Sequence, residues 1–248
     1  MRAKNRSYDE LRPVKIKPDY IDFADGSSYL EIGRTRVIAT ATVEEKVPPF
    51  LKNSGNGWIT AEYSMLPRST EKRNVRERIT GKLSGRSQEI QRLVGRSLRA
   101  VADLSLLGER TIILDCDVIQ ADGGTRAASI TAGCVALALA LKKMLDEKTI
   151  KIMPLKNLVS SVSVGIVDGE LLLDLDYNED SRAEIDMNVV ETDKGQLVEV
   201  QATAEKNPFS RKELSALLSL ADKGIKQLTQ IQMDTLKKKS ILFMAYGQ

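Results

Sequence analysis

Short runs of alternating or β-branched residues fill the first third of the chain and predict strands there. The runs cover residues 21–23, 28–32, 37–43 and 58–65. Asp25-Gly26 and Gly33-Arg34 separate the earlier runs as turns. Residues 68–85 have no apolar periodicity and contain two glycines, so they predict a long and mobile loop.

Apolar residues at helical spacing predict three helices in the remainder of the chain. One runs from Ser87 to Leu107 and stops at Gly108, and an alanine-rich one follows residue 126 and ends near Leu145. The last helix opens with the capping box Ser210-Arg-Lys-Glu213. Further strands are predicted at 111–119, 159–167, 170–176, 183–190 and 197–203, with Asp168-Gly169 as the turn of a hairpin.

This order of strands and helices predicts one domain of the α/β (α+β) class. No Pro-, Gly- or Ser-rich linker divides the chain, and its length can bury a substantial core. We expect two closely packed lobes. Residues 1–145 would hold the basic loop, and residues 146–248 would hold an acidic site and the last helix.

Composition excludes several classes of enzyme. The chain of 248 residues has 42% hydrophobic and 29% charged residues, as soluble proteins do. It contains no histidine, which excludes Ser-His-Asp and Cys-His hydrolases and the histidine-based metalloproteases. Cys116 and Cys134 are too few for a zinc cage, and as core thiols they indicate a reducing cytoplasm. We expect a cytoplasmic protein with no membrane segment, because the longest apolar stretch is too short.

The net charge of +3 is divided unevenly along the chain. Residues 68–86 contain seven basic and two acidic residues, whereas residues 168–186 contain eight acidic residues and one basic residue. Solvated surfaces would explain both segments. The alternative is that one segment binds a polyanion and the other a cation.

The four residues Gly123-Gly124-Thr125-Arg126 are the best single candidate for a binding site. They follow a predicted strand and open a helix, so the glycines would let the backbone approach an anion that the first helical amides bind. An ordinary tight turn explains the same residues equally well. Arg86, at the start of the preceding helix, could contact the same phosphate from another side.

The segment from Glu179 to Asp186 is the acidic candidate. Asp180 precedes a predicted strand, and Glu184 and Asp186 share one face of it. Such carboxylates suit a hard cation such as Mg²⁺ or serve as a general acid, although they could also protect a sheet edge from aggregation. With the phosphate candidate they indicate phosphoryl transfer.

Several blocks in register now make the chain resemble the bacterial ribonuclease PH family. They are Asp9-Glu-Leu-Arg-Pro13, Val47-Pro-Pro-Phe-Leu51, Gly57-Trp-Ile-Thr-Ala-Glu-Tyr-Ser-Met-Leu-Pro67, Ser84-Gly-Arg-Ser87, Asp115-Cys-Asp-Val-Ile-Gln-Ala-Asp-Gly-Gly-Thr-Arg126, Glu179-Asp180, Asp186-Met-Asn-Val-Val190 and Pro208-Phe-Ser210. The resemblance implies a single domain like the second domain of ribosomal protein S5. It also implies a phosphate-dependent 3′→5′ exoribonuclease that trims the 3′ ends of transfer RNA precursors and releases nucleoside diphosphates.

The resemblance also implies roles for particular residues and partners. Phosphate, the co-substrate, would bind to Arg86, Gly124, Thr125 and Arg126. The catalytic carboxylates, which would hold a divalent metal such as Mg²⁺, are Asp180 and Asp186. The RNA-binding arginines of the basic loop are Arg68, Arg73 and Arg76. The chain would assemble as a hexameric ring, a trimer of dimers.

One position departs from the family pattern. The family usually has Gln-Gly-Thr where this chain has Gln201-Ala202-Thr203. The added methyl group matters only if that position needs a positive φ angle. Two alternatives share the fold: a catalytic subunit of an archaeal exosome and a non-catalytic RNA-binding ring subunit. The second would have lost the Gly-Thr-Arg motif or the Asp180–Asp186 pair, and both are present.

Overall fold

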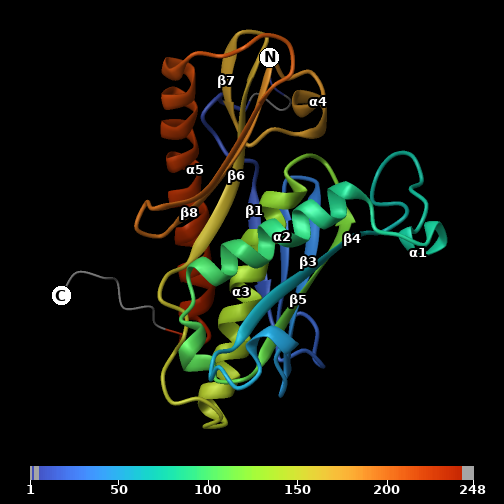
Figure 1. Ribbon diagram of the computed structural model, residues 1–248. Coiled ribbons are helices and arrows are strands. Elements are labelled where there is room, and N and C mark those ends of the chain that lie inside the picture. The colour runs from blue at the N-terminus through green and yellow to red at the C-terminus, as the bar shows by residue number, and fades with distance from the viewer. Residues whose placement is uncertain (1, 3–5, 242–248) are drawn as a thin grey trace.

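The computed structural model describes residue 2 and residues 6–241, except the side chains of residues 78 and 80. A five-stranded sheet in the order β1-β2-β3-β5-β4 forms the lower half of the molecule in Figure 1. Its strands are β1 (Val14–Pro18), β2 (Gly26–Ile32), β3 (Thr35–Glu44), β4 (Trp58–Met65) and β5 (Thr111–Gln120). Neighbouring strands are antiparallel except β4 and β5, which are parallel and are connected through helix α2 (Gly85–Ala100).

A second sheet of four antiparallel strands, in the order β7-β6-β8-β9, forms the upper half. It consists of β6 (Val159–Val167), β7 (Glu170–Leu173), β8 (Ile185–Thr192) and β9 (Leu197–Ala204). The short helix α4 (Tyr177–Asp180) connects β7 to β8. The long helix α5 (Arg211–Lys237) packs on β6 and β7 and also reaches β1 in the other sheet.

Helix α3 (Thr125–Asp146) lies between the two sheets and contacts β2, β3 and β5 on one side and β6 on the other. Its small residues make this close packing possible. At Gly26 in β2, a Cβ atom would lie 2.2 Å from the carbonyl oxygen of Ala136, so only glycine fits there. The helix is long and apolar enough to cross a membrane by composition, but 83% of its most apolar window is buried inside the protein. It is therefore the central helix of one hydrophobic core shared by both sheets.

The mixed α/β class is confirmed, and most of the predicted elements are present. Residues 21–23 form a turn rather than the predicted strand, and Phe23 is fully exposed. The predicted helix 87–107 ends at Ala100, and a separate 3₁₀ turn covers Leu104–Leu107. The basic loop contains one helical turn, α1 (Glu77–Thr80). Strand β1 and helix α4 were not predicted.

Candidate active site

The turn before α3 has the backbone shape that an anion-binding site needs. Gly123 and Gly124 both have positive φ angles, +77° and +67°. Gly124 is the N-cap of α3, so the first amides of a 22-residue helix point out of its end without intrahelical acceptors. The helix dipole adds partial positive charge at the same point. The predicted strand-turn-helix context of this motif is confirmed.

Two of the predicted arginines and both predicted aspartates line one open cavity of about 770 Å³. Arg86 comes from the first turn of α2, Arg126 from the first turn of α3, Asp180 from the end of α4 and Asp186 from β8. These four positions are spread over 101 residues of sequence and both halves of the molecule. The fold therefore places two cationic groups opposite two carboxylates.

Arg126 is held in place by neighbours that the sequence analysis missed. Its Nη1 atom donates a hydrogen bond of 2.6 Å to Oε1 of Gln201 in β9 and lies 3.3 Å from Oε1 of Glu89 in α2. The amide of Gln201 donates to the same Glu89 oxygen at 3.0 Å. Gln201 stands in the Gln-Ala-Thr motif, which is the one signal that could have revealed this role.

Thr125 faces away from this cavity. Its side chain is buried, and its hydroxyl group forms a 2.9 Å hydrogen bond with the hydroxyl of Tyr63 in β4. The Ser129 hydroxyl donates to the Thr125 carbonyl one turn later. Thr125 thus anchors the start of α3 to the first sheet, and it can offer a ligand only its backbone amide.

The two aspartates have raised pKa values, and the cause is mainly burial. Burial and the charge of Asp180 raise the pKa of Asp186 to about 6, although Arg126 opposes this. Burial also raises the pKa of Asp180, while Arg86 and Arg126 lower it. The charges of both arginines therefore act on the pKa of each carboxylate. Perturbed carboxylates in a cleft are typical of functional sites.

Asp186 fits a divalent cation. Its Oδ1 atom is buried and has no hydrogen-bond partner among the described residues. An oxygen atom left in this state is costly unless it binds a ligand, and carboxylate oxygens are the ligands that Mg²⁺ prefers. The grouping of Glu184 with Asp180 and Asp186 was wrong, because Glu184 does not line the cavity. In the described part of the chain no cluster of three or more acidic or cysteine residues suits a metal.

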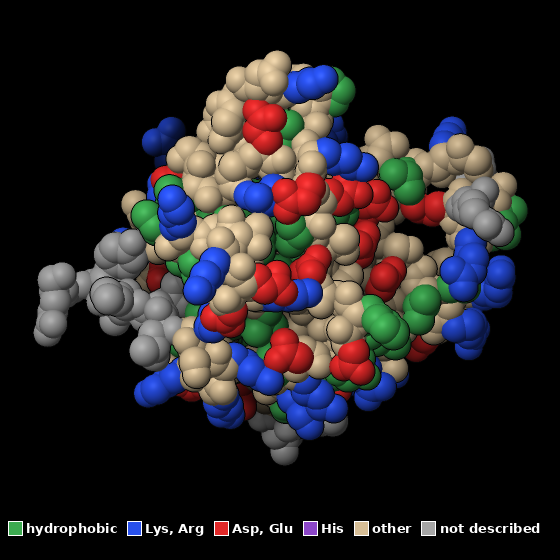
Figure 2. Space-filling view, turned by 90° about the horizontal axis from the view of Figure 1, so that it is seen from below, with side chains coloured by type: hydrophobic (Ala, Val, Ile, Leu, Met, Phe, Trp, Pro, Cys, Tyr) green, Lys and Arg blue, Asp and Glu red, His purple; other side chains and the backbone are tan. Residues whose placement is uncertain are grey.

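The segment between β4 and α2 projects from the body and carries the predicted RNA-binding arginines (Figure 1). Arg68, Arg73 and Arg76 are exposed, and Lys and Arg side chains gather on this projection at the right of Figure 2. Arg76 and Arg86 line a second cavity of about 990 Å³ next to the first. The basic segment thus leads to the cavity that holds the two aspartates.

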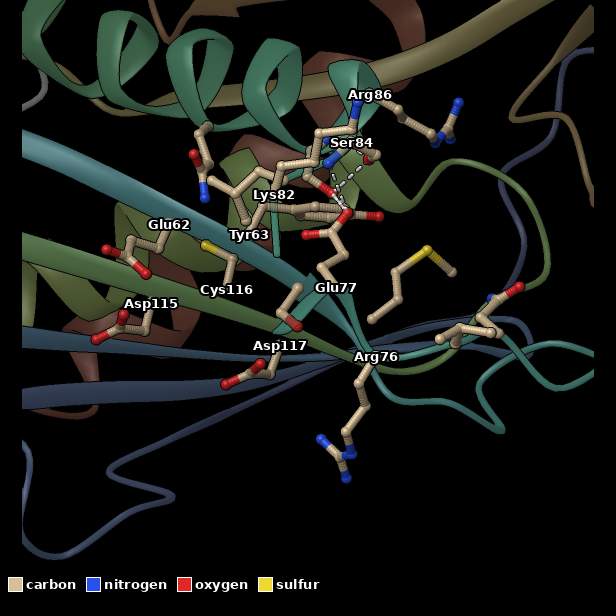
Figure 3. Close-up of a pocket in the computed structure, with 17 residues that line it drawn as sticks. Glu62, Tyr63, Arg76, Glu77, Lys82, Ser84, Arg86, Asp115, Cys116 and Asp117 are labelled. Atoms are coloured by element: carbon tan, nitrogen blue, oxygen red, sulfur yellow. Dashed lines mark hydrogen bonds between the residues drawn. The ribbon is translucent and has the colours of Figure 1, made fainter. Parts of the chain in front are cut away.

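Three carboxylates occupy another side of this second cavity (Figure 3). Glu62 lies directly opposite Asp115 on the paired strands β4 and β5, and Asp117 follows two residues later. Burial, with the charges of Glu62 and Asp117, raises the pKa of Asp115. In Figure 3, Arg86 points away from all three. These three carboxylates and the guanidinium of Arg86 therefore lie on different sides of the cavity.

Ala202 does not strain the backbone. It lies inside β9, paired with Met187 of β8, and its φ angle is not positive. Its side chain is half-buried against the core. The position therefore accepts a methyl group, and the family's glycine is not required by backbone conformation.

Comparisons with known proteins identify the family of the chain. Residues 10–143 match the first domain of the 3′ exoribonuclease family, and residues 157–224 match its second domain. The chain is 61% identical to Ribonuclease PH from Moorella thermoacetica over 236 residues, which cover 95% of this chain and 94% of the relative.

Solved structures show the same fold at low identity. The Archaeoglobus fulgidus exosome, with RNA bound to the active site, aligns with a TM-score of 0.78 at 22% identity over 97% of this chain and 92% of the other. Rice Rrp46 aligns with a TM-score of 0.76 at 20% identity over 95% of this chain and all of the other. The matches to both family domains and the 61% identity decide the assignment. The chain therefore belongs to the ribonuclease PH family, and it is a phosphorolytic 3′→5′ exoribonuclease.

Proposed function

We propose that the cavity lined by Arg86, Arg126, Asp180 and Asp186 is the active site in which inorganic phosphate attacks the 3′-terminal phosphodiester of RNA. The observation that carries this proposal is the meeting of two arginines and two carboxylates at the start of α3. In each reaction cycle an oxygen of inorganic phosphate bonds to the phosphorus atom, and the bond from this phosphorus to the 3′ oxygen of the preceding nucleotide breaks. The terminal nucleotide leaves as a nucleoside diphosphate.

The attacking group needs charge neutralisation more than a base. The chain has no histidine, and inorganic phosphate, with an ionisation near neutral pH, reaches the site largely as a dianion. Arg86 and Arg126 offset this charge, and the first amides of α3 bind phosphate oxygens. Holding the phosphate beside the RNA end supplies most of what such a reaction requires.

The two carboxylates have a different role, which concerns the leaving 3′ oxygen. We propose that Asp180 and Asp186 hold a divalent cation, most simply Mg²⁺, and the unpartnered oxygen of Asp186 supports this. A bound cation would offset the charge of the phosphates and of the leaving 3′ oxygen. A carboxyl group in this place can also donate a proton to that oxygen.

The central experiment incubates the protein with a 3′-extended transfer RNA precursor, with and without inorganic phosphate. We expect nucleoside diphosphates only when phosphate is present. Arg126→Ala or Arg86→Ala should raise the phosphate concentration needed, whereas Asp186→Asn should mainly lower turnover. Nucleoside monophosphates without phosphate would mean hydrolysis, and wild-type phosphate dependence in both arginine variants would refute the site.

We further propose that transfer RNA precursors bind the basic segment through Arg68, Arg73 and Arg76. Changing all three to alanine should weaken RNA binding and flatten its salt dependence by about 2 in the log–log slope, since each phosphate contact on a single strand contributes about 0.7. The control variant changes Lys237, Lys238 and Lys239 at the end of α5, which removes the same charge from an exposed site elsewhere. Equal slopes for both variants would contradict this role.

We also propose a ring of six chains and a cytoplasmic location. Exposed apolar side chains at Phe50 and Ile79, each 69% exposed, support contacts between copies. The two free cysteines support a reducing compartment. Light scattering on the purified protein tests the ring, and a particle of one or two chain masses would contradict it.

The exosome-subunit alternative has less support. The solved archaeal exosome structures are 22–23% identical to this chain, and such a likeness reflects the fold alone. A non-catalytic ring subunit is also disfavoured, because Arg126 and both aspartates are present and line one cavity. If the wild-type protein yields no product under any condition, the binding-subunit alternative becomes the better one.

A further inference from the structure

Arg12, in the segment before β1, connects the turn before α3 to the segment that follows β7, although it lines neither cavity. Its Nε and Nη2 atoms donate to the two carboxylate oxygens of Asp174 at 2.9 and 2.7 Å, and its backbone amide donates to Asp174 at 2.8 Å. Its Nη1 atom also donates to the carbonyl of Asp122, and Nη2 lies 3.4 Å from the carbonyl of Gly123. One buried guanidinium thus joins β7's end to the turn before α3.

The turn is tightly packed on this side. A Cβ atom at Gly123 would lie 2.4 Å from the carbonyl oxygen of Leu175, and a Cβ atom at Gly124 would lie 3.4 Å from Nη2 of Arg12. Thr35 in β3 holds the other side of the turn. Its hydroxyl donates to the Gly123 carbonyl at 2.7 Å and accepts from the Asp122 amide at 3.0 Å.

The chain that follows Asp174 leads directly to the carboxylate side of the site. Asp176 caps α4, and its side chain accepts from the Glu179 amide at 2.9 Å while Glu179 accepts from the Asp176 amide at 3.0 Å. Arg2 fixes the same Glu179 with bonds of 2.8 and 3.0 Å. Asp180 is the next residue, so its position depends on where Asp174 is held.

We propose that Arg12 is a positioning residue for the phosphate site, and that it sets the start of α3, and with it Arg126, relative to the segment that carries Asp180. The guanidinium fork is needed because it spans a carboxylate and two carbonyls at once. A lysine would keep the charge opposite Asp174 but cannot reach all of these groups. This inference rests on the proposed function of the cavity in binding inorganic phosphate.

The test compares wild type, Arg12→Lys and a matched control, Arg6→Lys. Arg6 is as buried as Arg12, with 8% of each side chain exposed. It pairs with Asp174 at 3.4 Å and with Glu179 at 2.9 Å, so it contacts the carboxylate side of the site as Arg12 does, but it does not touch the turn before α3. We measure phosphate binding by calorimetry and phosphate KM and kcat on a 3′-extended RNA. Arg12→Lys should weaken phosphate binding and raise its KM about tenfold, with kcat within about threefold. Arg6→Lys should leave phosphate KM unchanged.

The outcomes separate this inference from the proposed function. If wild type binds no phosphate, both fail. If wild type binds phosphate and Arg12→Lys changes only kcat, or Arg6→Lys raises KM equally, the inference alone fails. Should Arg12→Lys not fold, Thr35→Val decides by the same measurements, since it removes the hydroxyl that holds the turn and introduces no charge. Wild-type phosphate KM in Thr35→Val would then overturn the inference.

Discussion

The hydrogen bond that Arg126 donates to Gln201 leads to a quantitative prediction. Gln201→Leu keeps the approximate size of the side chain but removes the oxygen that accepts from Arg126 at 2.6 Å and the amide that donates to Glu89. Among the described residues, Arg126 then retains only the Glu89 carboxylate as a side-chain partner, at 3.3 Å. We expect the guanidinium to lose its fixed position in the proposed phosphate site while the fold remains unchanged.

The structure sets the size of this effect. A hydrogen bond to a charged group contributes about 1.5–3 kcal/mol, and only 14% of the Arg126 side chain is exposed, so water replaces the bond poorly. Glu89 is 41% exposed, and such a pair contributes at most about 1 kcal/mol. The Glu89 pair remains in the variant and still holds Arg126 in part. We therefore expect a net loss of phosphate-binding free energy near 1.4 kcal/mol, which corresponds to about a tenfold rise in phosphate KM.

Initial rates of nucleoside diphosphate release at varied phosphate give this KM directly. Gln230→Leu is the matched control, because Gln230 lies on the exposed face of α5 and, within the part of the chain that the structure describes, donates only to Asp234. RNA affinity, measured without phosphate, should stay the same in both variants. A phosphate KM within twofold of wild type in Gln201→Leu would refute the reasoning, as would an equal rise in the control.

Three further predictions concern stability and reactivity. Burial would raise the pKa of Glu179, but hydrogen bonds and the charge of Arg2 outweigh it and lower this pKa below 4.5. Glu179→Gln should therefore reduce the melting temperature at neutral pH, and the difference in melting temperature from wild type should shrink as pH falls below about 4.5. A difference that stays constant with pH would contradict this. Burial raises the pKa of Cys116, and that of Cys134 to about 12, so a thiol reagent at pH 8 should label neither residue until denaturant is added. A Cβ atom at Gly165 would lie 2.4 Å from a carbonyl oxygen of β8, so Gly165→Ala should lower the free energy of unfolding by about 1–3 kcal/mol in a urea titration.

Local sequence patterns predicted most of the secondary structure because most elements bury one regular face. Strand β4 was placed at its observed bounds, and the Asp168-Gly169 hairpin turn is present, with positive φ angles at both residues. The pattern failed where burial is not periodic. Residues 21–23 contain Ile and Phe but form an exposed turn, and the four residues of α4 are too few to show a helical period.

The candidate site was predictable in its chemistry but not in its support. Glycines before a helix and paired acids are visible in a sequence, and Arg86, Arg126, Asp180 and Asp186 do share a cavity. The contacts that position them join distant residues. Arg12 and Asp174 are 162 positions apart, and no spacing rule connects them. Such pairs are determined by tertiary packing, which local patterns do not record.

The central position of α3 has a consequence for dissecting the protein. The two family domains, residues 10–143 and 157–224, suggest a cut in the connecting segment. However, α3 belongs to the first half by sequence and covers β6 of the second, and α5 reaches back to β1. Either fragment would expose an apolar face that the other now buries, so neither should fold alone. Hydrogen exchange along α3 should then require global unfolding of the protein.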